Sequence, residues 1–183
     1  MKFKRILDIP VYDDKEEMWQ SVIETPRGSR HKYKYITRHN VFCLKKTLPE
    51  GMTFPFDFGF LPQTLGEDGD PLDVLVLMQD GTFPGCVIPS RLIGVLEATQ
   101  REGKGKPERN DRLLAIGHSD HEDRDVISAK DLDDQMLKEL EEFFITYNRQ
   151  EGRQFKVERV RGPKTAVDLV KEGMKLFKKN HPS

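Results

Sequence analysis

Cysteine is rare in this sequence, long apolar runs are absent, and neither sign of charge prevails. Only Cys43 and Cys86 occur among 183 residues, and they lack the paired spacing of a zinc or redox motif. We therefore expect no disulfide framework, and a reducing, cytoplasmic location fits best. No apolar run approaches the length of a membrane span, and charge interrupts the N-terminal residues early. Neither a membrane partner nor a targeting segment is expected.

The charges nearly cancel. Thirty Lys and Arg face thirty-one Asp and Glu, which gives a formal net charge of −1. A field this weak does not steer a protein to a polyanion, so nucleic acid is not an expected partner. Apolar residues make up 36% of the chain, enough for a core, and the length suits a single domain over residues 1–183.

Strand-like segments, bounded by Pro and Gly, fill the first half of the chain. The clearest of them are 19–25, 32–37, 41–46, 73–78 and 86–98. The stretch 100–111 carries Gly, Pro and charge with almost nothing apolar. It predicts a solvated loop between two strands, the second of which is RLLAIG at 112–117.

Two later segments have helical spacing instead. In 131–148, Leu132, Met136 and Leu140 recur on one face, with acidic residues in the first turn. The segment 165–180 also has one apolar face, follows Gly-Pro and ends in lysines. Short strands followed by two helices predict an α+β fold, a small, partly closed barrel with the helices packed outside.

The stretch DGDPLD at 68–73 places three carboxylates within six residues, directly before the apolar run VLVL. Carboxylates this close repel by on the order of a few kcal/mol per pair at an effective dielectric near 20. An exposed turn can tolerate them, because Asp-Gly and Asp-Pro form turns. Asp73, however, begins a predicted buried strand, which fixes the acids at its mouth. A hard divalent cation is then the favoured counter-charge.

Magnesium fits this stretch better than calcium does. An EF-hand loop that starts at Asp68 needs Gly at its sixth position and Glu at its twelfth, where Asp73 and Gln79 stand. Mg²⁺ instead takes one or two carboxylates with water and phosphate. Basic residues that face such a phosphate are available, since Lys32 and Lys34 point to the same side of a predicted strand.

The residues DGDPLDVLV resemble the signature of the soluble family I inorganic pyrophosphatases, in which Asp, a small residue, Asp, Pro, an apolar residue and Asp lead into an apolar strand. Further segments are similar to the family in the same order: IETP with SRHKY, FPFDFGFLPQTLGEDGD, and FFITYN. The resemblance covers about residues 23–158.

This resemblance implies a five-stranded OB-like barrel, a cytoplasmic homo-oligomer, and hydrolysis of pyrophosphate to two phosphates with Mg²⁺, or Mn²⁺ as an alternative. It implies that Asp70 accepts the proton of the attacking water. The candidate metal-binding residues are Asp68, Asp70, Asp73 and Glu24, with Asp111 if the register of its longer loop shifts. The candidate phosphate-binding residues are Lys32, Lys34, Lys46, Arg112 and Tyr147.

Some residues depart from the family pattern. Lys34 stands where the family has Glu, and Phe54 and Phe58 stand where it has Tyr; Lys45-Lys46 replaces an Asp-Arg pair. These changes add positive charge and remove two hydroxyl groups that would reach phosphate.

In the second acidic loop, Gln100 and Asn110 fall where carboxylates belong, and Asn148 replaces a Lys. Because each lost anion weakens cation binding, we expect one surviving metal site and a diminished second cluster. Three functions remain open: a pyrophosphatase of reduced turnover, a hydrolase of an organic diphosphate suited to the added basic residues, and a non-catalytic phosphate-binding paralogue.

Overall fold

Ten strands and two α-helices form from the residues that the computed structural model describes, 5–118 and 125–181. The strands are β1 (Tyr12–Asp13), β2 (Met18–Thr25), β3 (His31–Ile36), β4 (Val41–Thr47), β5 (Asp57–Phe60), β6 (Asp73–Leu77), β7 (Val87–Glu102), β8 (Glu108–Arg109), β9 (Arg112–Gly117) and β10 (Arg153–Arg161). The helices are α1 (Asp134–Arg149) and α2 (Pro163–Asn180). Short 3-10 turns lie at Ile6–Asp8 and Ala129–Asp131.

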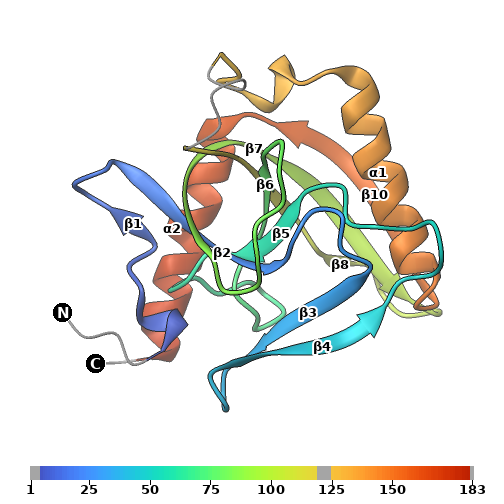
Figure 1. Ribbon diagram of the computed structural model, residues 1–183, viewed down its shortest axis with the longest axis horizontal. Helices are drawn as coiled ribbons and strands as arrows, with labels where there is room; N and C mark the ends of the chain where they lie inside the picture. The colour runs from blue at the N-terminus through green and yellow to red at the C-terminus, as the bar shows by residue number, and fades with distance from the viewer. Residues whose placement is uncertain (1–4, 119–124, 182–183) are drawn as a thin grey trace.

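Five of these strands close into a ring. Strand β2 pairs with β5, β5 with β6, β6 with β9, β9 with β7, and β7 returns to β2; only the β6–β9 pair is parallel. The expected small five-stranded barrel is therefore confirmed. Strands β3 and β4 form a separate hairpin that projects from the barrel (Figure 1).

Both predicted helices are confirmed, and they cover the outside of the sheet. Helix α1 packs beside β10 and α2 packs against β7 (Figure 1). The Asp133 carboxylate accepts hydrogen bonds from the backbone N–H groups of Gln135 and Met136 and so caps α1. Pro163 opens α2, where its missing N–H costs nothing.

The core explains why β6 is a continuous apolar run after its first residue. Along β6, Val74 and Val76 pack in a cluster with Val170 of α2, whereas Leu75 and Leu77 pack in a second cluster with Phe144 of α1. Successive side chains of a strand point to opposite faces, and here both faces are buried. The rigid end of β6 therefore fixes Asp73, its first residue, in place.

One strand was not predicted, and one predicted loop was too long. Strand β10 was not predicted, because most of its side chains are charged and a bulge between Val157 and Arg159 breaks the alternation of its apolar residues. The loop expected over 100–111 is shorter, because β7 continues to Glu102 and pairs with β8, which spans Glu108–Arg109.

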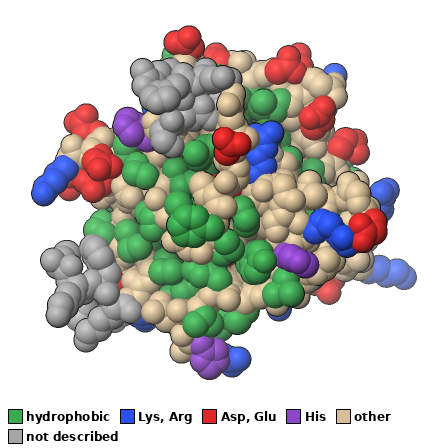
Figure 2. Space-filling model, in the orientation of Figure 1, with side chains coloured by type: hydrophobic (Ala, Val, Ile, Leu, Met, Phe, Trp, Pro, Cys, Tyr) green, Lys and Arg blue, Asp and Glu red, His purple; other side chains and the backbone are tan. Residues whose placement is uncertain are grey.

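The surface carries apolar groups that the core does not use. Figure 2 shows hydrophobic side chains gathered over the middle of one face, with charged groups mainly around its edge. Exposed large apolar residues include Val41 (45% exposed), Leu44 (56%) and Phe83 (64%). Neither described helix is long and apolar enough to cross a membrane.

Candidate active site

A cavity of about 280 Å³ lies between the barrel, the β3–β4 hairpin and the C-terminal end of α1. Its charged lining residues are Glu24, Asp68, Asp70, Asp73, Glu151, Lys32, Lys34, Lys45, Arg112 and Arg153. Uncharged polar groups of Gln100, Asn110, Tyr147 and Asn148 also reach it. The cavity is near the small end of ligand sites and suits a compact, highly charged molecule.

Eight of the ten candidate residues from the sequence line this cavity. They are Glu24, Asp68, Asp70, Asp73, Lys32, Lys34, Arg112 and Tyr147. The two others lie elsewhere. The Lys46 ammonium pairs with Glu151 Oε1 at 2.6 Å and lies 3.6 Å from the ring centroid of Tyr147, so it borders the cavity through two lining residues.

The structure does not bring Asp111 to this cavity. One of its carboxylate oxygens accepts a hydrogen bond from the Ala98 backbone N–H at 3.0 Å, and the other lies 2.6 Å from Arg109 Nε. These contacts hold its side chain against β7 and β8, and it lines a neighbouring cavity.

Local hydrogen bonds shape the acidic loop before β6. The Asp70 backbone N–H donates to Asp68 Oδ1 at 3.1 Å, and the Gly66 N–H donates to the Asp70 carbonyl at 2.7 Å. Between them Gly69 has φ of +84°, a conformation that favours glycine. At the other end, the Leu72 N–H donates to Thr64 Oγ1. The loop therefore presents its carboxylates from a defined backbone.

Of the four candidate carboxylates that line the cavity, three are paired with cations of the chain itself. Lys34 Nζ lies 2.8 Å from Asp70 Oδ2, and Arg112 Nη1 lies 2.7 Å from Asp73 Oδ2. Lys32 Nζ lies 3.5 Å from Glu24 Oε2. Basic side chains from β3 and β9 thus offset the mutual repulsion expected for the closely spaced carboxylates.

Burial shifts the pKa values of these groups toward their neutral forms. It raises the pKa of Glu24, against the opposing effects of Lys32 and of the Tyr35 N–H, which donates to Glu24 Oε1 at 2.7 Å. It lowers the pKa of Lys32 to about 8, with Glu24 opposing. Burial also raises the pKa of Asp73, although Arg112 counteracts it.

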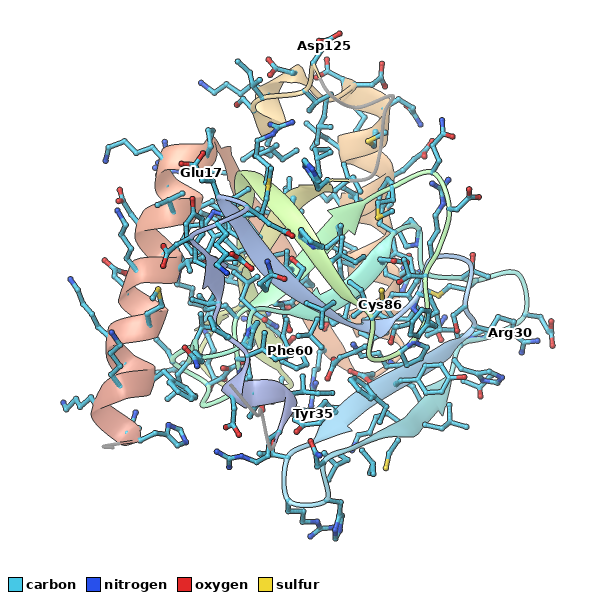
Figure 3. The ribbon with its side chains drawn as sticks, turned by 60° about the vertical axis from the view of Figure 1, so that its left-hand side comes forward. Glu17, Arg30, Tyr35, Phe60, Cys86 and Asp125 are labelled. Carbon is cyan, nitrogen blue, oxygen red and sulfur yellow. The ribbon has the colours of Figure 1, made fainter. Side chains whose placement is uncertain are left out.

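The hairpin that carries Lys32 and Lys34 is anchored by aromatic packing. Tyr35 of β3 lies against Phe60 of β5, with ring centroids 5.9 Å apart, at the junction of hairpin and barrel (Figure 3). The Lys32 ammonium lies 3.5 Å from the ring centroid of Phe58, a cation–π contact. Phe58 therefore supports Lys32 where the family has a tyrosine.

Neutral amides stand where the resemblance led us to look for carboxylates. Asn110 Nδ2 donates to Gln100 Oε1 at 2.6 Å, and Arg112 donates to the side-chain oxygen of Asn110. Within the described part of the chain, no acceptor meets the buried Nε–H of Arg112. A buried guanidinium donor without a partner, in a cavity lining, suits an incoming anion.

The oxygen donors of the cavity can be compared with what a divalent cation takes. Across residues 5–118 and 125–181, no group of three or more His, Cys, Asp and Glu side chains is arranged to hold a metal. Asp68, Asp70 and Asp73 still line one cavity, and Mg²⁺ needs only one or two carboxylates with water and phosphate. At Gln100 and Asn110 the anionic ligands for further metals are missing.

Sequence reasoning missed two charged residues of the site. Glu151 and Arg153 come from the turn after α1 and the start of β10, and they line the cavity beside Tyr147. Burial raises the pKa of the Tyr147 hydroxyl, so it stays a hydrogen-bond donor at neutral pH. Recognition of β10 as a strand would have placed both residues next to the predicted Tyr147.

Comparisons with known proteins agree with this geometry. Residues 21–178 match the family model described as inorganic pyrophosphatase. An inorganic pyrophosphatase of Synechocystis sp. is 36% identical over 157 residues, 86% of this chain and 90% of that protein. One of Methanosarcina acetivorans is 37% identical over 166 residues, 90% and 96% of the two chains. The crystal structure of the Thermus thermophilus inorganic pyrophosphatase superposes with a TM-score of 0.83 at 32% identity, covering 93% of this chain and 97% of that one. The chain therefore belongs to the family I inorganic pyrophosphatases.

Proposed function

We propose that this protein hydrolyses inorganic pyrophosphate to two phosphates with Mg²⁺, at a lower turnover than relatives that keep every carboxylate. The observation that carries the proposal is the single cavity in which the aspartates of DGDPLD face Lys32, Arg112 and Tyr147. Carboxylates on one wall and basic groups on the other are what a metal-assisted phosphoryl transfer requires.

In this proposal Asp68 and Asp73 hold the metal, with Mn²⁺ as an alternative to Mg²⁺. A bound divalent cation supplies charge neutralisation and lowers the pKa of the attacking water. Asp70 accepts the proton of that water, and its half-exposed carboxylate supports the role because water reaches it. Its pairing with Lys34 must loosen for the proton to transfer.

The basic residues hold the phosphate groups. Arg112 offers the unpartnered Nε–H, and its planar group suits a phosphate oxygen pair. Lys32, with a pKa of about 8, is mostly protonated at pH 7 and adds a second positive charge. Tyr147 contributes a hydroxyl donor from α1. Lys46 acts indirectly, through its contacts with the lining residues Tyr147 and Glu151.

We expect reduced turnover because neutral or basic side chains stand in the cavity where the family pattern has carboxylates. Gln100 and Asn110 bond to each other and bring no negative charge, so additional metals bind weakly. The Lys34 ammonium contacts one carboxylate oxygen of Asp70, the proposed proton acceptor. Glu24 is left as a ligand for a metal near the substrate, although Lys32 competes for its carboxylate.

Release of phosphate from pyrophosphate in Mg²⁺ buffer tests the proposal, with Asp70→Asn as the matched variant. We expect the variant to lose activity by about a hundredfold or more, within the range for loss of a general base. The Asp131→Asn variant changes an aspartate of the Ala129–Asp131 turn, outside the cavity, and should keep full activity. Wild-type phosphate release no faster than in a blank without protein would exclude catalysis and leave a phosphate-binding paralogue, whereas equal, measurable activity of wild type and Asp70→Asn would exclude Asp70 as the proton acceptor.

A hydrolase of an organic diphosphate is the second candidate, and one observation favours it. A further cavity of about 210 Å³ shares Asp68, Asp73 and Arg112 with the first, and four leucines line it: Leu65, Leu72, Leu169 and Leu176. An apolar group attached to a diphosphate has room there. Faster turnover of pyrophosphate than of nucleoside or prenyl diphosphates would exclude this candidate.

We further infer that residues 1–183 act as one domain in a cytoplasmic homo-oligomer. Both cysteines are free thiols, in keeping with a reducing compartment. The exposed apolar residues Val41, Leu44 and Phe83 favour contact with a second copy. Light scattering on the purified protein measures the number of subunits.

A further inference from the structure

We propose that Lys34 and Arg112 take the place of divalent cations as counter-charges of the acidic loop, so that this cavity binds a diphosphate anion without any metal. The inference concerns the same cavity as the proposed function and rests on its assignment as the pyrophosphate site. It separates binding, which the chain's own cations support, from hydrolysis, which needs the metal.

Both cations lie in direct contact with a carboxylate of the acidic loop or of β6. Lys34 Nζ contacts Asp70 at 2.8 Å, and Arg112 Nη1 contacts Asp73 at 2.7 Å. These are contact distances between oppositely charged groups, so each cation already neutralises the carboxylate that a dication would neutralise. Asp68 has no cation at such a distance among the described residues, and it accepts a backbone N–H instead.

The charges of the whole cavity lining balance. Five carboxylates line the cavity, and five basic side chains face them: Glu24, Asp68, Asp70, Asp73 and Glu151 against Lys32, Lys34, Lys45, Arg112 and Arg153. A diphosphate that enters therefore meets no net negative charge. With Glu at position 34, as the family pattern has it, acids would outnumber bases by two, and an anion would need metals to enter.

Hydrogen-bond donors remain for the anion. Arg112 side-chain exposure is 9%, and its Nε–H has no acceptor in the described structure. Lys34 is different, because its side chain is 41% exposed and its pair with Asp70 is open to water. A pair of that kind is weak, so the ammonium can turn from Asp70 to a phosphate oxygen at little cost.

Lys34 also affects the binding of a metal. The Lys34 ammonium on Asp70 places a positive charge beside Asp68 and Asp73, the proposed metal ligands, and that charge opposes the entry of a divalent cation. Lys34 should therefore weaken metal binding while it strengthens anion binding. These two effects have opposite signs, which gives the inference a clear signature.

Titration calorimetry with methylenediphosphonate, which is not hydrolysed, tests the inference in buffer with EDTA and in buffer with Mg²⁺. We expect wild-type protein to bind the analogue in EDTA with an affinity within about threefold of that in Mg²⁺. Lys34→Glu should weaken binding in EDTA by about tenfold or more, and Mg²⁺ should restore it. The same variant should bind Mn²⁺ alone more tightly than wild type, measured by the electron paramagnetic resonance of free Mn²⁺.

Lys164→Glu is the matched control. Lys164 also pairs with an aspartate, Asp168, at 2.9 Å, but on the exposed surface of α2. The control changes net charge by the same amount, so it should bind the analogue as wild type does. If Lys34→Glu fails to fold by circular dichroism, Lys34→Met replaces it, with the same direction expected.

Two results would overturn the inference. One is wild-type binding that disappears in EDTA; the other is equal binding in EDTA by wild type and the Lys34 variant. The pyrophosphate hydrolysis assay stands apart from both. Hydrolysis with strictly metal-dependent binding defeats only this inference, whereas metal-free binding without hydrolysis defeats only the proposed function.

Discussion

The ion pairs of the cavity differ in burial, and Glu24–Lys32 is the most buried of them. Both side chains are about one-tenth exposed, and their charged atoms are 3.5 Å apart. Transfer of two charges from water is costly, and their attraction only partly offsets that cost. The pair holds together because Tyr35 and the Phe58 ring add a hydrogen bond and a cation–π contact.

Glu24→Gln should lower the free energy of unfolding by about 3 kcal/mol, because it leaves the Lys32 ammonium buried without its counter-charge. The amide oxygen can still accept the Tyr35 N–H, so the change removes charge and little else. Urea unfolding at pH 7 measures the effect. Asp168→Asn breaks the exposed pair with Lys164 and should leave the midpoint unchanged. Equal midpoints for Glu24→Gln and wild type would contradict this account of the pair.

At the scale of elements, close approach of backbones fixes the barrel. A Cβ atom on Gly59 of β5 would lie 1.9 Å from the Val22 carbonyl oxygen on β2 and 2.8 Å from its carbon. These atoms belong to a paired strand and cannot rotate away, so the strands themselves would have to separate. Gly59 is therefore required by the distance between β2 and β5.

Gly59→Ala is expected to destabilise the fold by about 3 kcal/mol or more, at the upper end of overpacking effects. Thermal unfolding followed by circular dichroism measures it as a fall in Tm. Gly162→Ala is the control, since its Cβ would meet only Ser128 Oγ, at an ordinary 3.5 Å; because Gly162 is the N-cap of α2, the control itself should cost about 1 kcal/mol or less. A Tm for Gly59→Ala within a degree of the control would show that β2 and β5 can move apart freely.

Most elements could be predicted from the sequence because burial left a regular pattern in it. Strand β6 is buried on both faces and is apolar throughout after Asp73, and α1 and α2 bury one face each. Strand β10 could not be predicted, because Phe155 is its only buried residue. The other side chains of the strand are exposed or only partly buried. A strand held mainly by its pairing with β7 leaves little trace in hydrophobicity.

The site could be predicted in part for a similar reason. DGDPLD is a local motif, so its three aspartates were evident together. The pairing of Lys34 with Asp70 joins residues from the hairpin and the loop, and it depends on how the hairpin leans over the barrel. The sequence also did not decide toward which face the Asp111 side chain points. That depends on the register of β8 against β7, which continues to Glu102.

At the scale of the whole molecule, one pairing network connects nearly every element. The sheet runs from β1 through the barrel to β10, and both helices pack on it. Trp19, the only tryptophan, lies on β2, and its ring centroid is 4.9 Å from that of Tyr12. Helix α1, in contrast, lies beside β10. Fluorescence of Trp19 and circular dichroism of the helices therefore report on different parts of the same network.

If residues 1–183 form one domain, urea unfolding should give the same midpoint by both signals, since a single cooperative unit loses all its structure together. A homo-oligomer adds a second requirement, because dissociation makes stability depend on protein concentration. Both midpoints should then rise together as the concentration is raised tenfold. A fluorescence midpoint at a lower urea concentration than the circular dichroism midpoint would contradict this. It would mean that β1 and β2 unfold before the helices, and that the pairing of β2 with β7 does not make the barrel one cooperative unit.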